Sequence, residues 1–127
     1  MPDSHTTAPL RALFIEDNAD LRDIIGMLLE EEGLQVHTCA SAEEAELAFA
    51  PDRFDLVITD VSLPGISGTE LARRLLQRAP AIWIVFSSGY AFDRGLESWG
   101  PRVRSLSKPF EVEALQTLLD EIRASRP

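Results

Sequence analysis

The chain has 127 residues, which is enough for one folded domain with a sizeable core and too few for two typical domains. Its net charge of −9 should repel nucleic-acid phosphates, so we expect no direct DNA binding. No apolar run approaches the roughly 20 residues of a membrane-spanning helix, and the N-terminus lacks a signal-peptide pattern. The single cysteine, Cys39, excludes an intramolecular disulfide and agrees with a reducing compartment. These features predict a cytoplasmic protein without membrane insertion.

Short apolar runs alternate with amphipathic patterns along the chain. We expect residues 1–9 to form a flexible leader and residues 10–124 to form the folded domain. The predicted strands are Leu10–Ile15, Leu34–Cys39, Phe54–Thr59, Ala81–Phe86 and Val103–Leu106. The predicted helices lie near residues 18–33, 41–50, 67–80, 92–99 and 112–122, and the fourth of them has the weakest pattern.

Polar residues mark where the first three helices begin. Asn18 is the expected N-cap of the first helix, whose apolar stripe comprises Leu21, Ile24, Ile25, Leu28 and Leu29. Ser41 with Glu44, and Ser67 with Glu70, have the spacing of capping boxes. Five strands alternating with five helices predict an α/β fold, a single doubly wound (βα)5 domain with a parallel sheet and helices on both faces.

Chemically active residues follow the predicted strands. Open parallel sheets bind ligands at the carboxyl ends of their strands. In this chain those ends carry Glu16 and Asp17, Asp60, Ser88 and Lys108. Three neighbouring carboxylates repel one another unless a cation lies among them, and Mg²⁺ prefers oxygen ligands of this kind. We therefore expect a magnesium site at this edge.

The same residues could perform phosphoryl transfer. A carboxylate such as Asp60 can act as a nucleophile toward phosphorus when the charge on the transferred group is neutralised. Mg²⁺ and the ammonium group of Lys108 would neutralise it, and the hydroxyl of Ser88 would donate a hydrogen bond to a phosphoryl oxygen. Each residue alone has a simpler interpretation as a cap, turn or helix entry, so the prediction depends on their coincidence at four strand ends.

Taken together, these motifs resemble the receiver domain of two-component response regulators (the CheY-like superfamily). The resemblance covers about Leu10 to Ile122 and rests on these segments: Glu16-Asp17, Asp60 followed by Leu63-Pro64 and Gly68, Ser88-Gly89-Tyr90, and Lys108-Pro109-Phe110. It implies a flavodoxin-like sheet in the order 2-1-3-4-5. It also implies that a histidine kinase or histidine phosphotransfer protein phosphorylates Asp60, and that the domain then switches conformation to regulate a downstream partner.

The resemblance further assigns roles to individual residues. Glu16, Asp17, Asp60 and the backbone carbonyl of Ser62 would bind Mg²⁺. Lys108 would contact the phosphoryl group, Ser88 would be the switch hydroxyl, and the peptide before Pro109 would be cis. Apart from self-catalysed phosphoryl acceptance and autodephosphorylation, such a domain is not an enzyme.

One position departs from the family pattern. Many receivers carry an aromatic residue three positions before the lysine, where this chain has Ser105. We expect Ser88 to move toward the phosphoryl group while signalling runs through the region from Tyr90 to Ser105.

Several alternatives remain open from the sequence. A receiver fragment of a hybrid histidine kinase would carry the same motifs, and an adaptor that works without phosphorylation would have the same fold. A phosphatase with an aspartyl-phosphate intermediate usually has a second acid two residues after the nucleophile, where this chain has Ser62. A flavin-binding protein of similar fold is disfavoured, because three carboxylates at the carboxyl ends of the strands (the rim of the sheet) would repel a flavin phosphate.

Overall fold

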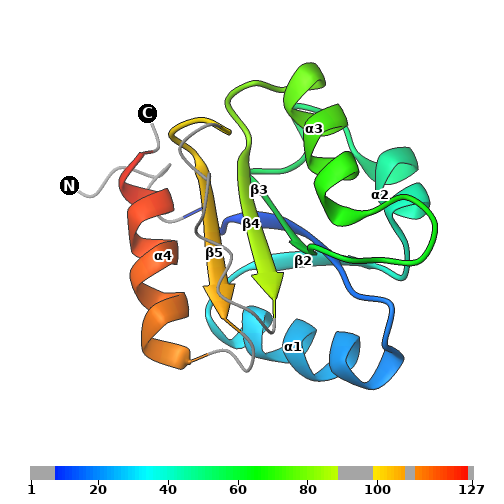
Figure 1. Ribbon diagram of the computed structural model, residues 1–127. Coiled ribbons are helices and arrows are strands. Elements are labelled where there is room, and N and C mark those ends of the chain that lie inside the picture. The colour runs from blue at the N-terminus through cyan, green and yellow to red at the C-terminus, as the bar shows by residue number, and fades with distance from the viewer. Residues whose placement is uncertain (1–7, 89–98, 108–110, 126–127) are drawn as a thin grey trace.

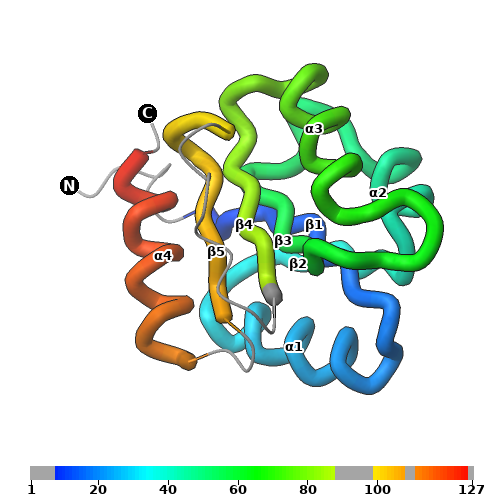
Figure 2. The backbone as a smooth tube through the Cα atoms, in the orientation of Figure 1, coloured from blue at the N-terminus to red at the C-terminus, as the bar shows by residue number. Residues whose placement is uncertain are grey.

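Five short strands pair in parallel in the order β2-β1-β3-β4-β5 in the computed structural model of the protein, as predicted (Figure 1). The structure describes residues 8–88, 99–107 and 111–125. The strands are β1 (Arg11–Ile15), β2 (Gln35–Cys39), β3 (Leu56–Asp60), β4 (Trp83–Ser88) and β5 (Val103–Ser107). Figure 2 shows β5, β4, β3 and β1 side by side across the sheet.

Helices cover both faces of this sheet. Those within the described residues are α1 (Ala19–Glu31), α2 (Ala42–Ala48), α3 (Gly68–Arg78) and α4 (Val112–Ala124). Helices α2 and α3 lie on one side, and α1 and α4 lie on the other (Figure 1). A helix is expected at residues 92–99. Residues 92–98 of this range lie outside the described part of the chain.

Across the described ranges, no helix combines the length and apolarity that crossing a bilayer would require.

Three strands run further than their apolar residues indicate. β5 ends at Ser107, one residue beyond the predicted end at Leu106. β3 includes Asp60, and β4 continues through Ser88, two residues beyond the predicted end at Phe86. Parallel pairing continues there, because Asp60 lies opposite Ser87 and Ser88 lies opposite Ser107. Backbone groups make these ladder hydrogen bonds whatever the side chain is, so hydropathy alone ends the strands too early.

The predicted helix starts are confirmed. The side chain of Asn18 accepts a hydrogen bond from the backbone N–H of Leu21 at 3.0 Å. The Ser41 hydroxyl accepts one from Glu44, and the Ser67 hydroxyl accepts one from Glu70, both at 3.1 Å. Each bond satisfies a backbone donor that a helix start would otherwise leave without a partner.

Alternating strand residues fill two cores, one on each face of the sheet. Under α2 and α3 lie Leu13, Ile15, Val57, Ile84, Phe86 and Val103. Under α1 and α4 lie Ala12, Phe14, Leu56, Ile58, Trp83, Val85 and Leu106. Trp83 is 6% exposed, and its indole N–H donates to the Ser125 hydroxyl at 3.1 Å. Trp83 therefore belongs to the core and has a polar partner for its indole N–H.

The predicted apolar stripe of α1 is only partly buried. Leu29 is fully buried, whereas Leu21 is exposed and Ile24 is 63% exposed. Met27 lies on the same exposed side at 61%. The apolar arc of this helix is wider than the surface that the sheet covers, so part of it faces outward.

Cys39 ends β2 as a buried free thiol. Burial raises its pKa to about 11, and the nearby carboxylate of Glu44 adds to the rise. A thiol held in its neutral form is a poor nucleophile. Cys39 therefore acts as a small apolar core residue.

The two-sided core gives a direct test of the packing on α3. Leu75 is fully buried there, so Leu75→Ala should lower the free energy of unfolding by about 2–5 kcal/mol in urea denaturation. Leu47 on α2 is 89% exposed, and Leu47→Ala should change it by less than about 0.5 kcal/mol. Equal losses in the two variants would contradict this assignment of the core.

Candidate functional site

A row of polar residues crosses the carboxyl edge of the sheet. Ile15 pairs with Thr59, so the next residues, Glu16 and Asp60, lie beside each other at the ends of β1 and β3. Asp60 in turn lies opposite Ser87 on β4. Neighbouring strands are roughly 4.8 Å apart, which brings these three positions within the span of one small ligand.

Glu16 and Asp17 differ in environment. Glu16 is only 2% exposed, its backbone N–H donates to the carbonyl of Cys39 at 3.0 Å, and its carbonyl accepts from Arg22 at 2.9 Å. Its carboxylate accepts from the backbone N–H of Asn18 at 3.1 Å. Asp17, between them, is exposed. Glu16 thus folds the turn that presents Asp17 to solvent at the rim.

Asp60 is half-buried at the end of β3. One carboxylate oxygen accepts a hydrogen bond from the backbone N–H of Ser62 at 3.3 Å. The backbone carbonyl of Asp60 accepts from the Thr59 hydroxyl at 3.0 Å, and Thr59 is fully buried. The contact with Ser62 orients the carboxylate, and the contact with Thr59 holds the backbone of the acid.

Gly68 sets how closely α3 approaches Asp60. Its backbone N–H donates to the carbonyl of Val61 at 3.0 Å. A Cβ atom on Gly68 would overlap the carbonyl oxygen of Asp60 and would lie 2.8 Å from its carbonyl carbon. Only glycine allows this approach, so the need for glycine at position 68 is steric. The family motif included this residue, but its contact with Asp60 could not be read from spacing.

The other predicted site residues are only partly within the described structure. Ser62 is exposed two residues after Asp60, and Ser105 is half-buried on β5. Ser88 ends β4, and its backbone alone is part of the described structure. Lys108, Pro109 and Tyr90 lie outside the described residues. Their predicted roles therefore stay predictions.

The residues at the rim fit a hard cation by their chemistry. Within residues 8–88, 99–107 and 111–125, no three His, Cys, Asp or Glu side chains form a metal-binding group. Mg²⁺ does not need three such ligands, because it is usually bound by one or two carboxylates together with waters and phosphate oxygens. Exposed Asp17 and half-buried Asp60 offer two carboxylates on neighbouring strand ends.

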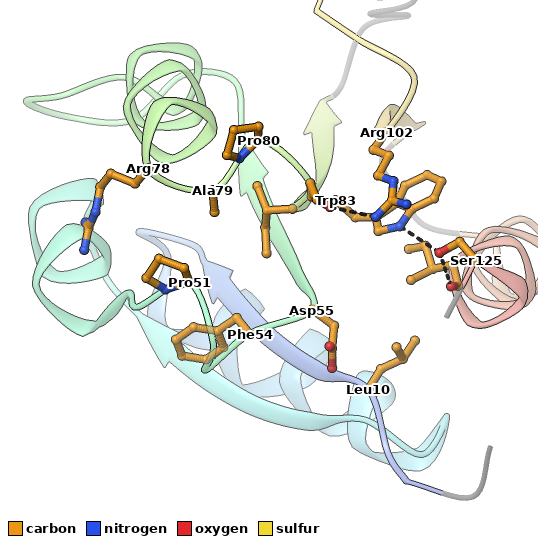
Figure 3. A pocket seen from close by; sticks show the side chains of 13 residues that line it. Leu10, Pro51, Phe54, Asp55, Arg78, Ala79, Pro80, Trp83, Arg102 and Ser125 are labelled. Atoms are coloured by element: carbon orange, nitrogen blue, oxygen red, sulfur yellow. Dashed lines mark hydrogen bonds between the residues drawn. The ribbon is translucent and has the colours of Figure 1, made fainter. Parts of the chain in front are cut away.

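A pocket of about 420 Å³ lies at the opposite end of the strands (Figure 3). Pro51, Phe54, Pro80 and Trp83 contribute to its lining. Asp55 also lines the pocket, and its carboxylate accepts hydrogen bonds from the backbone N–H and the side-chain Nε–H of Arg11 at 2.8 and 3.3 Å. Five residues of β3 separate Asp55 from the carboxyl edge, so this pocket is remote from the acidic rim.

Comparisons with known proteins agree with this geometry. The model of the response regulator receiver domain family matches residues 12–120. The response regulator receiver protein CpdR of Brucella abortus is 34% identical over 114 residues, which cover 88% of this chain and 92% of CpdR. The response regulator protein FleR of Pseudomonas aeruginosa is 33% identical over 86% of this chain, but the match spans only 24% of FleR.

Solved structures agree as well. The receiver domain of HemR from Leptospira biflexa superposes with a TM-score of 0.80 at 28% identity, covering 93% of this chain and 98% of that one. TrrA from Thermotoga maritima, in complex with Mg²⁺-BeF, gives a TM-score of 0.78 at 30% identity, covering 89% and 98%.

The close contact at Gly68 predicts a specific cost. Gly68→Ala must displace backbone atoms of Asp60 and should lower the free energy of unfolding by about 3 kcal/mol. Gly26→Ala in α1 is the matched control, because its added Cβ would make an ordinary contact 3.5 Å from Thr38. That variant should be neutral or stabilised by up to about 1 kcal/mol. A tolerated Gly68→Ala in urea denaturation would contradict the close approach.

Proposed function

The chain belongs to the response regulator receiver domain family, and on that premise we propose that Asp60 accepts a phosphoryl group from a phosphohistidine. The observation that carries the proposal is the row formed by Glu16, Asp60 and Ser87 at the carboxyl edge. Receiver domains are signalling domains rather than conventional enzymes. The chemistry that we assign to this chain is therefore acceptance and later hydrolysis of its own phosphoryl group.

The transfer follows from the position of the acid. A carboxylate oxygen of Asp60 attacks phosphorus, and the bond from phosphorus to the imidazole nitrogen breaks. The electron pair of that bond returns to the ring, which takes up a proton, and Asp60 becomes an acyl phosphate. Because Asp60 is half-buried and its backbone is bonded to Thr59, the acceptor oxygen has a restricted set of approaches.

The metal role is part of the same proposal. Glu16, Asp17, Asp60 and the carbonyl of Ser62 would hold Mg²⁺, and Glu16 would also place Asp17 through its bond to the N–H of Asn18. When bound, the ion neutralises charge on the transferred phosphoryl oxygens. The Mg²⁺-BeF complex of TrrA, a relative with 30% identity, supports this assignment. Lys108 and Ser88 would supply the remaining positive charge and hydroxyl donor.

A protein donor must reach the rim to deliver its phosphoryl group. Helix α1 begins two residues after Asp17 and presents exposed apolar side chains from Leu21, Ile24 and Met27. Exposed apolar clusters beside a site often contact partner proteins. We therefore assign this face to the histidine kinase or histidine phosphotransfer protein, in the cytoplasm, with residues 10–124 as the phosphorylated domain. The downstream partner would respond to the altered conformation.

A receiver within a hybrid histidine kinase stays a second candidate. The receiver domain of the hybrid histidine kinase CckA resembles this chain with a TM-score of 0.67 and 31% identity. Either setting uses the same acceptor chemistry at Asp60.

Acetyl phosphate tests the proposal without a kinase. With Mg²⁺ present, intact mass spectrometry should show the addition of one phosphoryl group, and Asp60→Asn should abolish it. Chelation by EDTA should abolish it as well, because the charge on the transferred group is then no longer neutralised. Asp52→Asn is the matched control, since Asp52 is an exposed acid at the far end of the sheet, and it should be phosphorylated normally. A full mass gain in Asp60→Asn would refute the assignment.

A further inference from the structure

Trp99 bridges a strand and a helix beside the site. It is half-buried just before β5 and packs against the core under α2 and α3. Its ring meets that of Phe86 on β4 at 5.4 Å and 70°, an edge-to-face arrangement. The guanidinium group of Arg73 on α3 lies 5.9 Å from the centre of the same ring. Trp99 therefore contacts both β4 and α3.

Ser105 leaves room for this contact. Phe86 and Ser105 are paired across β4 and β5. Phe86 and Val103 lie in the core under α2 and α3, and Ser105, two residues after Val103 on the same strand, lies on the same face. A serine side chain is too small to cover a phenylalanine ring. Trp99, arriving from the chain ahead of β5, covers it instead.

The two elements that Trp99 joins are both anchored at Asp60. On the strand side, Asp60 pairs with Ser87, the residue directly after Phe86. On the helix side, Gly68 at the start of α3 lies against the carbonyl of Asp60. A phosphoryl group on Asp60 adds charge and bulk between the end of β4 and the start of α3. The relative position of Phe86 and Arg73 should respond, and Trp99 lies between them.

We propose that Trp99 couples phosphorylation of Asp60 to the outer surface of α3, an inference that rests on the proposed function. Next to Trp99 lies a hollow of about 480 Å³ whose lining includes Arg73, Leu76 and Gln77. Arg73 also donates to the carboxylate of Glu70 at 2.6 Å, so it keeps a partner on its own helix when the Trp99 ring moves. The hollow then changes shape without leaving a charge unpaired, and a partner could distinguish the two forms.

Fluorescence of a single tryptophan tests the coupling. The chain has two tryptophans, so Trp83→Phe leaves Trp99 as the only one. Circular dichroism would verify its fold, and intact mass would report phosphorylation by acetyl phosphate and Mg²⁺. We expect phosphorylation to shift the emission maximum of Trp99 and to change its quenching by acrylamide. A full mass gain with unchanged emission and quenching would overturn the coupling. Failure to gain mass would instead overturn the proposed function, and the inference with it.

Two further variants separate coupling from simple packing. Amide NMR shifts of Arg73, Leu76 and Gln77 should change when Asp60 is phosphorylated in the natural chain. Trp99→Phe keeps an aromatic ring against Phe86 and should preserve these changes, whereas Trp99→Ala should lose them while Asp60 still gains its phosphoryl group. The same α3 shifts in a phosphorylated Trp99→Ala protein would overturn the role of Trp99. If Trp99→Ala does not fold, the fluorescence test in the Trp83→Phe protein decides.

Discussion

Parallel pairing of β1, β3 and β4 is the constraint on which the rest of the structure depends. Because the three strands run in the same direction, Glu16, Asp60 and Ser87 end in one row. No local signal within any one segment could place them together. The apolar residues of both faces favour this pairing, since sliding a strand by one residue would exchange the side chains of its two faces and disrupt the packing of both cores. Core packing and site geometry thus have the same origin.

The turn after β3 connects this row to the outside of the molecule. Asp60 offers its carboxylate at the rim, while its carbonyl packs against the start of α3 at Gly68. The residue that carries the carboxylate therefore also contacts the start of α3. The inner side of this helix is fully buried at Leu71 and Leu75. Trp99 forms a second connection to α3, because it contacts both Phe86 on β4 and Arg73 on α3. Packing contacts thus join the strand edge at Asp60 to α3.

Much of this arrangement could be predicted from the sequence, because the signals are local. Side-chain oxygens of Asn18, Ser41 and Ser67 start helices wherever they occur in the right context, and all three do so here. The strand order came from resemblance and was confirmed. The hydropathy pattern predicts that β4 ends at Phe86, because Ser87 and Ser88 have polar side chains. Both serines nevertheless belong to the strand, because their backbones extend the pairing. The exposure of Ile24 and the contact between Phe86 and Trp99 depend on which elements meet in space, which spacing along one segment does not encode.

Chemical location of the acyl phosphate tests the central claim most directly. Borohydride reduces an acyl phosphate to an alcohol, so an aspartyl phosphate is converted to homoserine at its own position. After treatment with acetyl phosphate and Mg²⁺, reduction and peptide sequencing by mass spectrometry should find homoserine at position 60. Homoserine at position 17 in place of position 60, or at neither, would contradict the account of Asp60 as the phosphoryl acceptor.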